Sequence, residues 1–186
     1  MDYRPNIDAV VWFVSEVMPG MRHLAERPSF WIVGSNPSAA VQRLAGGDVH
    51  VTGRVEDVRP SLAHAAVVVA PLRIARGIQN KVLEAMAMAA PVIVTPQARE
   101  GLEACGDDEL IEANTAEAFA SAIRRLLFEG GAATGRRARE RVPRDFSWQS
   151  SFEALDAQLE PGCAEARETT KPRLAANLGS LPAAVP

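Results

Sequence analysis

The sequence predicts an α/β protein with a Rossmann-like parallel β-sheet and helices on both of its faces. Short apolar runs alternate with stretches whose apolar residues recur at helical spacing, which is typical of a parallel sheet. Three runs end at a glycine or open into a glycine-bearing loop, and ligands of such sheets bind beyond the carboxyl ends of the strands. The predicted strands are residues 29–34, 49–53, 66–72, 91–96 and 109–113, and we expect 66–72 to be fully buried.

Helices are predicted between these strands. Asn6 caps the first, over residues 7–18, and Thr115 caps a long amphipathic helix that ends at Phe128, because both are good N-cap residues followed by apolar residues at helical spacing. The remaining predicted helices span residues 37–44, 58–65, 79–89, 132–141 and 148–159. Periodicity fades near residue 160, so we expect one domain over residues 1–160 and a disordered tail over 161–186.

The composition argues against several classes of protein. A hydrophobic content of 47% is that of an ordinary soluble domain, and a net charge of -3 without a Lys/Arg-rich run gives no support for nucleic-acid binding. Cys105 and Cys163 are far apart and the histidines share no ligand spacing, so neither a metal site nor a disulfide framework is predicted. No apolar run approaches the roughly 20 residues that span a bilayer, and no secretory signal is evident, so we expect a cytoplasmic location.

The most informative segment is residues 67–87, which indicates a strand, a basic glycine-bearing loop and the start of a helix. The amides of a helix N-terminus attract anions held in such a loop. Between residues 58 and 83 the chain has no Asp or Glu, but it has four cations: Arg59, Arg73, Arg76 and Lys81. Lys81 falls in the first helical turn, where the helix dipole disfavours a cation, and a ligand explains such a residue better than stability does. The segment therefore predicts a phosphate-binding site.

Glu84 is the first acid after this loop. Under the phosphate interpretation it reaches a neutral polar part of the same ligand. A plainer interpretation stays open: the loop is simply solvated, and Glu84 pairs with Lys81 on the helix, a contact worth roughly 0.2–0.5 kcal/mol.

Five landmarks in the chain match one known family. They are Trp-Ile-Val-Gly at residues 31–34, Val-Thr-Gly-Arg-Val at 51–55, the apolar run 66–72, residues 77–87 and Pro-Val-Ile-Val at 91–94. Together they resemble the C-terminal, nucleotide-sugar-binding domain of retaining GT-B glycosyltransferases of the glycosyl transferases group 1 type. Residues 1–6, 16–19 and 75–87 are similar to bacterial sugar transferases of exopolysaccharide loci, including those of PEP-CTERM sorting systems. The resemblance covers residues 1–159.

The resemblance implies a role for each matching residue. Glu84 would hold the ribose hydroxyls of a donor nucleotide, and Arg54 and Val55 would lie beside its base. The donor diphosphate would meet loop amides and two cations: Gly77, Ile78, Gln79, Asn80, Arg76 and Lys81. The substrate would be a UDP- or GDP-linked sugar, bound without metal or further cofactor. No catalytic residue is predicted.

The chain departs from the family pattern in three respects. Arg76 occupies the position of the family's first motif glutamate, eight residues before Glu84, so contacts to the transferred sugar would lie elsewhere. Ala89 stands where the family has a helix-ending glycine, at a cost of about 1 kcal/mol. The family's N-terminal acceptor domain is missing, so we expect a truncated or split protein with a weakened sheet and little or no transferase activity.

The primary hypothesis is the donor-binding part of a retaining hexosyltransferase that serves a glycan or lipid-linked acceptor in exopolysaccharide biosynthesis. The acceptor would bind through the missing domain or a partner chain, and family analogy adds the inner face of the cytoplasmic membrane as a location. Two alternatives stay open: a nucleotide-sugar epimerase of the same fold, and a non-catalytic nucleotide-binding or interaction module.

Overall fold

The computed structural model describes residues 2–24, 27–153 and 155–157. The chain divides into two compact units, Met1–Phe146 and Ser147–Pro186. The first unit holds the strands and the helices α1 to α7, and in the second unit residues 148–153 and 155–157 are helical. The predicted tail over residues 161–186 lies outside the described residues.

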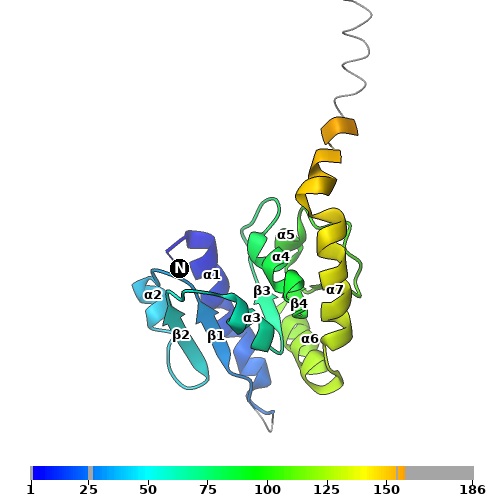
Figure 1. Cartoon of the computed structure of the whole chain (residues 1–186). Helices are drawn as coiled ribbons and strands as arrows, with labels where there is room; N and C mark the ends of the chain where they lie inside the picture. The colour runs from blue at the N-terminus through cyan, green and yellow to red at the C-terminus, as the bar shows by residue number, and fades with distance from the viewer. Residues whose placement is uncertain (1, 25–26, 154, 158–186) are drawn as a thin grey trace, which may run out of the picture. The chain divides into compact units, whose positions relative to one another are not determined.

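Five short strands form two parallel sheets in the first unit (Figure 1). In one sheet β1 (Phe30–Val33) pairs with β2 (Val49–Gly53); in the other, β4 (Val92–Val94) lies between β3 (Val68–Ala70) and β5 (Ile111–Glu112). Every pair of strands is parallel, which confirms the predicted α/β fold class. The arrangement differs from the single predicted sheet in one respect. Within the described part of the chain, β1 and β3 do not pair with each other, so each keeps an unpaired edge.

The first helical segment changes geometry along its length, from α1 (Arg4–Trp12) through a π-helical turn, η1 (Phe13–Val17), to a 3₁₀ turn, η2 (Met18–Met21). Asn6 is not its N-cap, so that prediction is wrong: Tyr3 takes the cap position. Pro5 favours a helix start that lies nearer the N-terminus than predicted, because proline is favoured in the first helical turn. The displaced Asn6 side chain is therefore available for a contact elsewhere.

Thr115 caps α6 (Ala116–Glu129) as predicted, and its hydroxyl accepts a hydrogen bond from the Ala118 amide at 3.1 Å. The predicted helix over residues 79–89 corresponds to α4 (Asn80–Ala87). The other helices are α2 (Ala39–Gln42), α3 (Arg59–His64), α5 (Pro96–Arg99) and α7 (Ala132–Asp145).

Three buried apolar clusters form the core, and the first helical segment contributes to each. Ala9 packs in the cluster that includes β4 and α4, Phe13 in the one that includes α6, and Val10 in the one that includes β1 and β2. β4 is buried along its whole length. β3 is buried only at Ala70, and its two valines are half-buried, so the prediction of a fully buried strand over 66–72 is wrong. The reason is that β3 lies at the edge of its sheet.

The far end of α4 is held in a tight contact. Ala89 has a φ angle of 57°, in the left-handed region that the family's glycine at this position predicts. A Cβ atom added to Gly135 would overlap the carbonyl oxygen of Ala89, so α7 can cross the end of α4 only with glycine there. This crossing anchors α4, whose opposite end opens onto the candidate site.

Candidate functional site

A hollow of about 470 Å³ opens where the chain leaves the carboxyl end of β3 and enters α4. Three segments build it: the start of α1, the loop after β3 and the first turn of α4. Its described lining includes three cations and no carboxylate. The polar lining residues are Tyr3, Asn6, Arg73, Arg76, Gln79 and Lys81. We call it the basic hollow.

The N-terminus of α4 faces this hollow without a side-chain cap. Gln79 occupies the cap position but does not accept from the helix amides. Its side-chain amide instead donates to the carbonyl oxygens of Arg76 and Gly77, at 3.2 and 3.0 Å. Gly77 has a φ angle of 65°, which lets the loop turn at this point. The first amides of α4 therefore lack a side-chain acceptor, which suits an anion.

Lys81 joins α4 to α1 across the hollow. Its Nζ atom donates to the side-chain oxygen of Asn6 at 2.7 Å. Burial of the ammonium group lowers the pKa of Lys81 below its ordinary value, and the nearby Glu84 carboxylate opposes this effect. The side chain as a whole remains exposed, so the desolvation is local to the ammonium end. Because Asn6 is neutral, its hydrogen bond orients the ammonium without cancelling the charge.

Arg73 has a different environment from Lys81. Its guanidinium donates to both carboxylate oxygens of Asp8, at 2.6 and 3.0 Å, and lies 5.8 Å from the ring centroid of Trp12. The hydrogen bond to Asp8 raises the pKa of Arg73 above its ordinary value. Both side chains are partly exposed, so the pair contributes at most about 1 kcal/mol to stability. The pair nevertheless compensates the charge of Arg73.

The structure brings together part of the predicted site. Arg76, Gln79 and Lys81 line the basic hollow, and within the described chain no ion pair involving Arg76 is found. Asn80 begins α4, and Gly77 and Ile78 belong to the exposed loop beside the hollow.

Besides Gly77, Ile78 and Asn80, three further predicted site residues do not line this hollow. Glu84 lies further along α4 on an exposed position, where it acts on the charge of Lys81. Arg54 and Val55 follow the end of β2. Their predicted contacts with the ribose and the base of a nucleotide stay predictions.

Two residues of the site escaped prediction from the local sequence. Asn6 and Asp8 are 75 and 65 positions from their partners, Lys81 and Arg73. Asn6 also looks like an ordinary helix cap. The signal that could have found Asn6 is the segment at residues 1–6, which is one of the stretches that carry the family resemblance.

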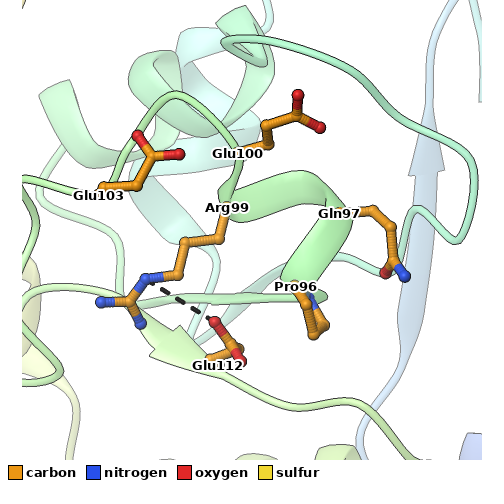
Figure 2. A pocket seen from close by; sticks show the side chains of 6 residues that line it. All are labelled: Pro96, Gln97, Arg99, Glu100, Glu103 and Glu112. Carbon is orange, nitrogen blue, oxygen red and sulfur yellow. Dashed lines mark ion pairs between the residues drawn. The ribbon is translucent and has the colours of Figure 1, made fainter.

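A second hollow, of about 570 Å³, lies at the carboxyl ends of β4 and β5 (Figure 2). Its charged lining residues are Arg99, Glu100, Glu103 and Glu112, and we call it the acidic hollow. Arg99 approaches Glu112 at 3.8 Å and Asp107 at 3.0 Å, and donates to the carbonyl oxygen of Cys105 at 2.7 Å. The single cation is therefore engaged by neighbouring groups, and the surplus of carboxylates disfavours phosphate. Among the described residues no group of three or more His, Cys, Asp or Glu side chains could hold a metal ion.

The comparisons with known proteins identify the family and the fold of the chain. The sequence profile described as "Glycosyl transferases group 1" matches residues 1–129, which is more than half of the chain. The chain therefore belongs to the glycosyl transferases group 1 family. Among curated protein sequences, none matches the chain.

Solved structures show the same fold. A sucrose-phosphate synthase from Thermosynechococcus elongatus superposes with a TM-score of 0.65 at 22% identity, over 89% of this chain and 44% of that chain. HepE from Anabaena, in complex with UDP, gives 0.64 at 13% identity, over 78% and 44%. A glycosyltransferase from Rickettsia africae gives 0.62 at 15%, over 80% and 44%. These likenesses confirm the parallel α/β architecture of GT-B glycosyltransferases, and the chain spans less than half the length of each structure.

None of the helices in the described residues combines the length and the apolar character that crossing a bilayer requires.

Proposed function

We propose that the chain binds the donor nucleotide for a glycosyltransferase. The observation that supports this most strongly is the basic hollow, in which Arg76, Lys81 and the uncapped start of α4 meet without a carboxylate in the lining. A glycosyl transfer from a nucleotide diphosphate sugar must stabilise a departing diphosphate. Fixed cations and helix amides can stabilise that charge without a metal ion or another cofactor.

The size of the hollow supports a small-molecule ligand. Its volume of about 470 Å³ lies within the range of roughly 300–1,000 Å³ that is usual for such sites. The HepE structure contains UDP, and we extend this to a UDP- or GDP-linked sugar for the present chain. The ribose contact of Glu84 and the base contacts of Arg54 and Val55 belong to the same proposal.

The finer parts of the proposal rest on the family resemblance. They are a hexose as the transferred group, retention of its anomeric configuration, and a glycan or lipid-linked acceptor in exopolysaccharide biosynthesis. The acceptor would bind an N-terminal domain or a partner chain, and the present chain, which spans less than half the length of each solved structure that it resembles, would have little transferase activity by itself. Incubating the purified chain with radiolabelled donor sugars tests this: turnover equal to that of a full-length relative would contradict it. Cell fractionation tests a location in the cytoplasm or at the inner face of its membrane.

Calorimetric titration tests the nucleotide site directly. We expect UDP or GDP to bind, and Lys81→Met to weaken binding about tenfold or more, because a hydrogen bond to a charged group is worth about 1.5–3 kcal/mol. Arg125→Met is the matched control: it removes an exposed cation of α6 and should leave the Kd unchanged. Absence of heat with every nucleoside diphosphate would contradict the proposal and favour an interaction module.

A further inference from the structure

The start of α1 holds two of the three cations of the basic hollow. Asn6 accepts from Lys81, and Asp8, two positions later, accepts from Arg73. Both contacts join α1 to a segment that is at least 65 residues away in the sequence. Nothing in the local sequence of the loop indicates that these cations have partners.

The two partners have opposite electrostatic effects. The Asp8 carboxylate compensates the charge of Arg73 through two hydrogen bonds. The side-chain oxygen of Asn6 restrains the Nζ atom of Lys81 through a hydrogen bond of 2.7 Å. Because the Asn6 amide has no charge, it leaves the ammonium charge available. Arg76 lines the hollow and has no ion pair within the described residues. The hollow therefore presents two cations that have no ion pair within the described residues, Arg76 and Lys81, together with the first amides of α4.

We propose that Asn6 is a positioning residue that directs the ammonium of Lys81 into the basic hollow, and that Asp8 withdraws Arg73 from anion binding. This inference rests on the proposed nucleotide function and adds a selectivity to it. Arg76, Lys81 and one helix N-terminus match the two phosphoryl groups of a nucleoside diphosphate. A third phosphoryl group would meet no further cation that lacks an ion pair, so UTP should bind no more tightly than UDP.

The matched pair of variants is Asn6→Asp and Asp8→Asn. Asn6→Asp should weaken UDP binding about tenfold, because the new carboxylate would pair with Lys81 as Asp8 pairs with Arg73. It should not unfold the protein, because the first turn of α1 has no acid and a carboxylate there is favourable. Asp8→Asn should release Arg73, so that UTP binds several-fold more tightly than UDP, whereas wild-type protein binds the two equally. Titration calorimetry in the absence of divalent metal, with thermal melting of each variant, measures these effects.

A readout without ligand separates positioning from general support of the fold. NMR titration of the Lys81 side chain should show a higher pKa in Asn6→Asp than in wild type, because a carboxylate replaces a neutral acceptor. The other charged and titratable groups around the hollow are unchanged in both proteins: Tyr3, Asp8, Arg73, Arg76 and Glu84.

The outcomes distinguish the two proposals. Wild-type binding of UDP that is unaffected by Asn6→Asp, or an unchanged pKa of Lys81, overturns the role of Asn6 while the nucleotide function stands. A UTP-to-UDP ratio that Asp8→Asn leaves unchanged overturns the role of Asp8. Failure of the wild type to bind any nucleotide overturns the proposed function itself, and the selectivity inference with it.

Discussion

The basic hollow and the acidic hollow occupy equivalent places in the fold but have opposite charge. The first follows the carboxyl end of β3, and the second lies at the carboxyl ends of β4 and β5. Parallel sheets place ligand sites at this edge, because loops and helix N-termini converge there. The location is therefore shared, and the side chains decide which hollow suits a phosphate.

The two hollows also differ in how they are assembled. Every lining residue of the acidic hollow comes from residues 96–112, and its one arginine is engaged by groups from the same stretch. The basic hollow combines the start of α1 with a segment some 70 positions later in the chain. The partner of Lys81 across this hollow is the neutral side chain of Asn6, so the ammonium group keeps its charge. A site that combines distant segments can have its charge adjusted from a second element, as Asn6 and Asp8 do.

Reversing one charge in each hollow should produce the largest difference. Arg76→Glu should weaken UDP binding at least about a hundredfold, because it removes an uncompensated cation and adds a repulsive charge close to the ligand. Glu100→Lys makes the converse change in the acidic hollow and should alter the Kd less than twofold. Titration calorimetry at constant ionic strength measures both. A strong effect of Glu100→Lys would mean that the nucleotide lies in the acidic hollow.

Raising the pH should weaken the binding of UDP in the basic hollow. Burial lowers the pKa of Lys81, so its charge is lost at a lower pH than that of an ordinary lysine. UDP affinity should fall several-fold as the pH rises from neutral through this lowered pKa. In Lys81→Arg the decline should be absent, because arginine stays charged. Between this lowered pKa and the ordinary pKa of lysine, the folded state binds fewer protons than the unfolded state, so this group's contribution to stability increases with pH there. A decline that persists in Lys81→Arg would exclude Lys81 as its cause.

The smallest expected effect concerns the residue with a positive φ angle that follows a helix at each hollow. Gly101, with a φ of 85°, follows α5 at the acidic hollow. Ala89, with a φ of 57°, follows α4, whose other end opens onto the basic hollow. Ala89→Gly should raise the free energy of unfolding by about 0.5–1 kcal/mol, since relief of the left-handed strain outweighs the added freedom of the unfolded chain. Gly101→Ala should lower it, because its Cβ would come within 2.7 Å of the Ile78 side chain. Urea denaturation measures both, and equal signs would contradict the comparison.

Several features could be predicted from local patterns. The parallel α/β class follows from apolar runs that alternate with helical periodicity, and the cap of α6 from Thr115 followed by an amphipathic stretch. The presence of Arg76 and Lys81 at one anion-attracting junction follows from the absence of acids around them and from the start of α4. These features depend on residues that are close in the chain.

Other features could not be predicted in this way. The incomplete burial of β3 depends on which strand lies beside it, and no property of its valines reveals that neighbour. Asn6 is a reasonable helix cap by its residue type, and only the earlier start of α1 at Arg4 makes its side chain a partner for Lys81. The first error arises because a long-range neighbour decides burial, and the second because Pro5 favours an earlier helix start than Asn6 does.

The sequence by itself determined the class of fold, most of its elements and the basic character of the loop after β3. Periodicity, capping and the helix dipole act within a few residues, so they can be recognised along the chain. Only the tertiary structure decided which cations of that loop keep their charge available. That outcome depends on Asn6 and Asp8, which the packing of α1 brings to Lys81 and Arg73 over distances in sequence where local rules have no reach.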